Sequence, residues 1–156
     1  MKDLALFISA VFITGITLSS VSCSTGACFN ETNAYMKASF YIDSSSTVMA
    51  PDSLTLYGIG MDTNLIYKAE TGLTLAQIPL NDSTSSCTLV MKINTVFDTL
   101  TAWYSTYPHV LSKECGYSFY HTLDSLKYTK HIIDKITIIK NTITTASEEN
   151  IRIYYN

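Results

Sequence analysis

Alternation of apolar and polar residues is the feature of this sequence that most constrains its fold. In SCTLVMKI (86–93), Cys87 and every second residue up to Ile93 are apolar, whereas Thr88 and Lys92 lie between them. A period of two is typical of a β-strand with one buried face. We therefore predict a strand here, with Cys87 as a small buried hydrophobe.

The same kind of segment recurs along the chain at intervals of 8–12 residues. We expect eight or nine strands, at 35–42, 53–60, 65–70, 73–80, 86–93, 97–107, 115–123, 131–143 and 150–156. Short strands at this spacing predict an all-β, immunoglobulin-like antiparallel β-sandwich over residues 34–156.

Three parts of the chain bear on where these predicted strands begin and end. Thr71-Gly72 is expected to form a hairpin turn between its flanking strands. Pro79 indicates a strand end or a sheet edge. The segment 131–143 also has isoleucines at helical spacing, but its β-branched residues and the alternation from Ile136 to Ile138 favour a strand.

The composition is that of one soluble domain with wet strand faces. The 156 residues carry a net charge of −3, only 15% are charged, and 21 Thr, 18 Ser and 11 Tyr are present. Thr and Tyr favour strands. Because no basic stripe exists, nucleic acid is not an expected partner.

The N-terminus has the character of an export signal. Residues Leu4 to Leu18 contain no charge. As a helix this run would be about 22 Å long, short of the roughly 30 Å hydrocarbon core of a bilayer. We predict a signal peptide at 1–22 rather than an uncleaved membrane anchor.

Cys23 follows this run directly after a set of small residues. Ser20 and Ser22 suit a signal peptidase at positions −3 and −1, and the segment resembles a bacterial lipobox, except that Ser20 stands where Leu is usual. We expect lipidation of Cys23, with simple secretion as the alternative. Residues 23–33 would form a short tether, and two or three acyl chains would anchor the chain firmly.

The other cysteines are Cys28, Cys87 and Cys115. Export implies an oxidising compartment, and three pairings are open. We favour Cys28–Cys115 because both lie at element ends. No CxxC pair exists and no His has a metal-site spacing to a Cys, so we expect no metal and no cofactor.

Candidate catalytic residues are few. His109 and Cys115 could act as base and nucleophile, but a bridged Cys115 beside a solvated loop histidine is the favoured interpretation. His121 is expected at a strand end, bonded to a neighbour, and His131 is expected to be exposed. Asp134 is expected on a wet face. We predict that the chain is not an enzyme.

Aromatic residues on the strand 97–107 are the candidate binding site. Trp103, Tyr104 and Tyr107 could stack a glycan or contact a protein, since Trp and Tyr give large rigid contact areas. The alternative is that they belong to the core. An outward Trp103 would favour binding.

Several stretches together resemble a known family. They are DSLTLYGIG (52–60), IPLNDST (78–84), SKECGYSFY (112–120) and NIRIYY (150–155). In this order they resemble small uncharacterised lipoproteins of Bacteroidota, a domain of unknown function, over roughly residues 28–156. The resemblance implies an envelope protein with an immunoglobulin-like sandwich. It favours a lipidated Cys23 and supports the Cys28–Cys115 bridge, but it transfers no catalytic or ligand residue.

The resemblance also implies a class of modification site. Bacteria of this group glycosylate Asp-Ser/Thr motifs followed by an apolar residue or Thr, and four such motifs begin at Asp52, Asp82, Asp98 and Asp124. Ser83 is the best acceptor candidate because it lies in a predicted loop.

The sequence therefore predicts a lipid-anchored envelope lipoprotein, periplasmic or at the outer membrane, that binds or supports another envelope component. The alternative is a carbohydrate-binding module that uses exposed aromatics. Expected partners are the membrane, through the N-terminal lipid, and an envelope protein or glycan.

Overall fold

The computed structural model describes residue 28, residues 31–42 and residues 47–156. The expected signal peptide (1–22), Cys23 and most of the expected tether (23–33) lie outside the described residues. The described part consists of strands and turns, with no helix. Its ten strands are β1 (Tyr35–Ile42), β2 (Leu54–Gly58), β3 (Leu65–Glu70), β4 (Leu75–Pro79), β5 (Ser86–Ile93), β6 (Val96–Ser112), β7 (Gly116–Tyr128), β8 (Ile133–Ile138), β9 (Thr142–Ile143) and β10 (Ile151–Tyr155).

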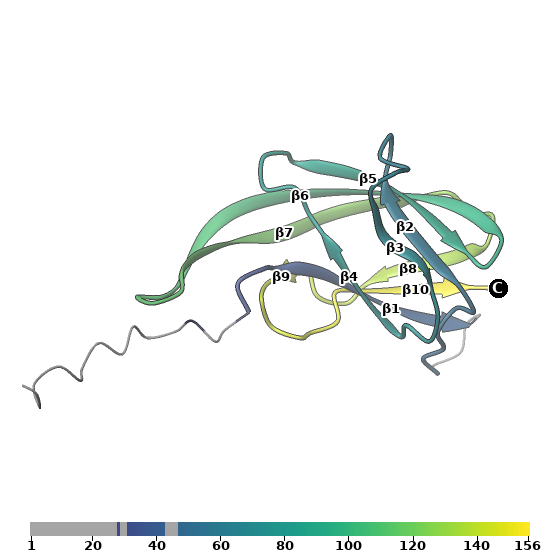
Figure 1. Cartoon of the computed structure of the whole chain (residues 1–156), viewed down its shortest axis with the longest axis horizontal. Coiled ribbons are helices and arrows are strands. Elements are labelled where there is room, and N and C mark those ends of the chain that lie inside the picture. Colours follow the sequence, from purple (N-terminus) through teal and green to yellow (C-terminus); the bar gives the residue numbers. More distant parts are fainter. Residues whose placement is uncertain (1–27, 29–30, 43–46) are drawn as a thin grey trace, which may run out of the picture.

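The strands form two sheets packed against each other (Figure 1). One sheet has the order β4-β1-β10-β8 and the other the order β3-β2-β5-β6-β7-β9. The strand pair β1–β10 is parallel, and the other pairings between the described strands are antiparallel. The predicted all-β sandwich is confirmed, with sheets of four and six strands, but the expectation that it is antiparallel is wrong for the β1–β10 pair.

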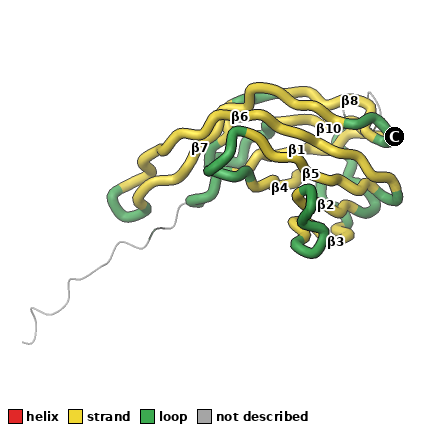
Figure 2. The backbone as a smooth tube through the Cα atoms, turned by 90° about the horizontal axis from the view of Figure 1, so that it is seen from above, coloured by secondary structure: helices red, strands yellow, loops and turns green. Residues whose placement is uncertain are grey.

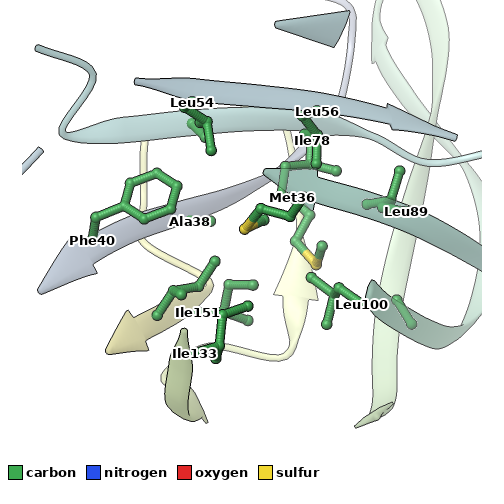
Figure 3. Packing of buried hydrophobic residues seen from close by; sticks show 14 of the residues in the cluster. Met36, Ala38, Phe40, Leu54, Leu56, Ile78, Leu89, Leu100, Ile133 and Ile151 are labelled. Atoms are coloured by element: carbon green, nitrogen blue, oxygen red, sulfur yellow. The ribbon is translucent and has the colours of Figure 1, made fainter. Parts of the chain in front are cut away.

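The core lies between the two sheets and is made by the inward side of the alternating pattern (Figure 3). Met36 and Phe40 of β1 face Leu54 of β2 and Leu100 of β6 across it, and all four are fully buried. Full burial of one such side chain contributes roughly 1.5–3 kcal/mol. Cys87 is on the inward side of β5, as the alternation predicted, but it is half-buried at the margin of this core rather than fully buried.

Most strand positions agree with the alternation. β1, β3 and β5 have the predicted bounds, and β4 ends at Pro79 on the edge of its sheet. The predicted hairpin at Thr71-Gly72 is wrong, because β3 and β4 belong to different sheets. Gly72, with φ of 69°, instead lies where the chain crosses from one sheet to the other.

The segment 131–143 is extended, as predicted, but it forms two strands in different sheets. Asn150 causes the break. Its carbonyl accepts hydrogen bonds from the N–H groups of Ile139 and Lys140, and its side-chain amide donates to the carbonyls of Lys140 and Thr142. These bonds hold the chain in a turn between β8 and β9.

The β6–β7 hairpin is longer than predicted. It was expected to end near Tyr107 and to resume at Cys115, but pairing continues to Ser112 opposite Gly116. Beyond Trp103, β6 is no longer paired with β5 and is an edge strand, where Pro108 is tolerated. Figures 1 and 2 show the hairpin extending past the ends of the other strands.

A buried carboxylate holds the corner between the sheets. Asp98 is 1% exposed and accepts hydrogen bonds from the backbone N–H groups of His131, Ile132 and Ile133, at 2.9–3.0 Å, and from the Thr129 hydroxyl. Burial by itself would raise the pKa of Asp98, but these hydrogen bonds outweigh it and lower the pKa to about 2. The donors lie in the turn that leads from β7 to β8.

We expect Asp98→Asn to lower the free energy of unfolding at pH 7 by roughly 2–3 kcal/mol, because an amide leaves buried N–H groups without acceptors. Asp134→Asn, at an exposed position of β8, is the matched control and should change stability by less than about 0.5 kcal/mol. Urea unfolding measures both.

The same variants test the pH dependence. Since the pKa of Asp98 is about 2 in the fold and 3.8 otherwise, its contribution is present above pH 4 and disappears as the pH falls toward 2. Asp98→Asn should remove this acid dependence. Equal stability of the Asp98→Asn and Asp134→Asn variants at pH 7 would show that the corner does not depend on the carboxylate.

Candidate functional site on the β6–β7 hairpin

The tip of the hairpin is joined to the N-terminal segment. Cys115, just before β7, forms a disulfide with Cys28, with a Cα–Cα distance of 5.0 Å. Nearby, the Ser118 hydroxyl donates to the carbonyl of Thr32. The predicted Cys28–Cys115 bridge is confirmed. It leaves no thiol on Cys115, so the hypothesis of a Cys115 nucleophile with His109 as base is wrong.

The outer face of the hairpin carries an exposed row of aromatic side chains. Trp103 and Tyr107 are each 39% exposed and lie four residues apart on this face, about 14 Å along the strand. Beyond them, the His109 ring stacks on Tyr120 with 4.3 Å between ring centroids, and Tyr107 meets the edge of Tyr120 at 6.2 Å. His109 therefore lies on a strand, and its predicted place in a loop is wrong.

Tyr104 does not belong to this row. It is 1% exposed, and its hydroxyl donates to the carbonyl of Asn81 while accepting from the Asn81 N–H, both at 3.0 Å. Burial raises the pKa of Tyr104. The expectation of Tyr104 as an exposed ligand-binding residue is wrong, because it alternates with the outward Trp103 and faces the core.

His121 is buried at the base of the hairpin. Predicted at a strand end, it lies inside β7 because this strand continues to Tyr128. It is 1% exposed, its Nδ1 lies 2.9 Å from the Thr106 hydroxyl, and its Nε2 lies 3.5 Å from the Asp82 carboxylate. Burial lowers the pKa of His121, and the charge of Asp82 opposes this shift.

The remaining charged candidates have structural contacts. His131 is exposed, as predicted, and its Nδ1 lies 2.9 Å from Asp98. Asp134 is exposed, as predicted. In the ranges that the structure describes, no three His, Cys, Asp or Glu side chains are grouped to hold a metal ion.

Two clefts lie away from the aromatic row. A cleft of about 780 Å³ between the β2–β3 hairpin and the ends of β4 and β5 has an apolar lining that includes Met61 and Leu80. Cys87 contributes to it, but burial raises the pKa of this thiol and makes it a poor nucleophile. A cleft of about 450 Å³ lies between residues 32–35, the end of β4 and the first residues of β7, where Tyr117 and Phe119 contribute to its lining.

The glycosylation motifs differ in exposure. Ser83 lies on an exposed loop, as predicted, whereas Asp98 is buried in a strand. Helices able to span a membrane are not found in the part of the chain that the structure describes.

Comparison with known proteins gives one finding. A model described as "Family of unknown function (DUF6452)" matches residues 53–155. No curated protein and no solved structure matches the chain.

His121 makes stability dependent on pH. Its pKa in the fold is lower than the ordinary 6.5, so its contribution is present above pH 6.5 and is lost as the pH falls below this value. We expect the free energy of unfolding to decrease between pH 7 and pH 5, and His121→Gln to flatten this decrease. His109→Gln, at an exposed position, is the control. Stability that rises toward pH 5 would mean that attraction to Asp82 dominates over burial.

Proposed function

The chain belongs to this family of unknown function, DUF6452, and on that premise we propose that it is a lipid-anchored protein of the bacterial cell envelope with a non-enzymatic binding or supporting role. The observation that carries the proposal is the Cys28–Cys115 disulfide. Disulfides persist in oxidising compartments, so the bridge supports export. The apolar run 4–18, followed by Ser20, Ser22 and Cys23, supports the lipidated route.

The contacts of the hairpin support a role in binding rather than in catalysis. Cys115 is bridged, His109 is stacked on Tyr120, and His121 is buried against Thr106. The hairpin instead offers a long exposed surface that is covalently joined to the segment beside the proposed anchor. A protein tethered close to a membrane can present such a surface to another envelope component.

We expect the mature protein from the membrane fraction to have the mass of residues 23–156 plus acyl chains, and to gain two hydrogens on reduction. Cys23→Ser should move nearly all of the protein out of the membrane fraction, because acyl chains supply the anchor. Cys87→Ser is the matched control and should remain membrane-bound. Intact mass spectrometry of both fractions is the measurement. If the protein were found in the soluble fraction with the mass of residues 23–156 and no acyl chain, lipid anchoring would be contradicted and the protein would be a secreted one.

A second candidate function is glycan binding by the outer face of the hairpin. It is favoured by the outward Trp103 and Tyr107, whose rings lie on the same face of β6. Exposed Trp and Tyr rings offer the flat apolar surfaces that sugars stack against. The glycan would be a component of the envelope near the anchored domain.

For this candidate, we expect Trp103→Ala to weaken glycan binding roughly tenfold or more, as truncation of a central aromatic contact does. Phe97→Ala is the control, because Phe97 is also an exposed aromatic of β6 but lies at the opposite end of the strand from the tip. Glycan arrays followed by calorimetry measure both variants. Equal binding by the two variants, or no binding by the wild type, would remove this function.

A further inference from the structure

The inner face of the β6–β7 hairpin stays apolar after it has left the sandwich. Along this face Val110 lies opposite Tyr117, and Pro108 lies opposite Phe119. The same face nearer the sandwich carries the buried Tyr104 and His121. The inward face of the hairpin therefore continues past the buried residues: Phe119 is half-buried and Tyr117 and Phe119 line the cleft against residues 32–35, whereas Pro108 and Val110 are exposed.

These four residues form what we name the tip surface: Pro108, Val110, Tyr117 and Phe119. Val110 is 75% exposed and Tyr117 is 63% exposed, and the Tyr117 ring contacts the edge of Phe119 at 5.6 Å. Large apolar side chains exposed together mark an interaction surface rather than a random surface position. Figures 1 and 2 show that the turn end of the β6–β7 hairpin protrudes beyond the ends of the other strands.

We propose that the tip surface lies in the interfacial layer of the lipid bilayer to which the chain is anchored. This inference rests on the proposed lipid anchor at Cys23. The occupant of the surface is thus a membrane, and the hairpin fixes which end of the domain faces it.

The length of the tether supports this orientation. Cys28 is bonded to Cys115 at the tip, and it follows Cys23 by five residues. Five extended residues reach at most about 18 Å. Because the Cα atoms of Cys28 and Cys115 are 5.0 Å apart, the Cα of Cys115 lies within roughly 23 Å of the Cα of Cys23. Phe97, at the other end of β6, lies thirteen residues from Val110, about 43 Å along the strand.

The chemistry of the tip fits an interface between water and lipid. Tyrosine is enriched at this depth of membranes because its ring is apolar and its hydroxyl is wet. Lys113 and Glu114, both exposed in the turn of the hairpin, have opposite charges. The contact should therefore form on neutral lipids as well as on anionic ones.

Tryptophan quenching by brominated lipids tests the inference. The chain has one tryptophan, so Trp103→Phe gives a silent background for single probes. Val110→Trp places a probe on the tip surface, and Phe97→Trp is the matched control at the far end. Both native residues are exposed, so the probes require no space in the core. The acylated protein is reconstituted into phosphatidylcholine vesicles with and without bromine on the acyl chains.

We expect brominated lipid to remove roughly half or more of the Val110→Trp emission and to leave the Phe97→Trp emission unchanged. Equal emission of the Val110→Trp protein in the two kinds of vesicle would overturn the inference. This also holds if the emission spectrum shows that the tryptophan is buried, because the burial would then be against protein and not against lipid. Mass spectrometry of the same samples distinguishes a failure of the proposed lipid anchor from a failure of the proposed orientation. A protein without acyl chains contradicts the anchor, whereas an acylated protein with an unquenched tip contradicts only the orientation.

Discussion

The Asp98 carboxylate holds the corner on which the two-sheet arrangement depends. Apolar burial drives the sheets together, but it is not directional and does not fix where the chain passes between them. Asp98 does so through hydrogen bonds from the turn between β7 and β8, which belong to different sheets. Unpaired, this buried charge would cost far more than a typical hydrogen bond contributes. The corner therefore forms cooperatively, with all the hydrogen-bond donors to Asp98 in place.

Asn150 has the corresponding role at the next crossing. Its side chain accepts from the N–H of Lys37 in β1 and donates to two carbonyls of the segment that leads into β9. It thus joins the parallel pair β1–β10 to the chain that moves across to the six-stranded sheet. Two buried polar residues with satisfied partners thus hold two consecutive crossings between the sheets, β7–β8 and β8–β9, whereas the apolar residues hold the sheets together.

Strand positions could be predicted from the sequence because they depend on local alternation, but the crossings could not. The period of two locates β5 and β10 without reference to any other segment. Thr71-Gly72 has the composition of a hairpin turn, and nothing local shows that its flanking strands enter different sheets. Asp98 could have been recognised, since it alternates in phase with Leu100 and Ala102 and was thus bound to face inward. Its donors, which lie about thirty residues later, could not be read from the pattern.

In the candidate site, too, local alternation predicts some features, whereas others depend on segments far away in the sequence. Alternation states that Trp103 and Tyr104 face opposite sides, but the direction of each depends on neighbouring strands. The strand expected at 97–107 stops before Pro108, whereas β6 continues past this proline as an edge strand, where proline is tolerated. A free two-stranded ribbon is marginally stable in water. The Cys28–Cys115 bridge secures the ribbon at its tip, so the most exposed part of the fold is also covalently held.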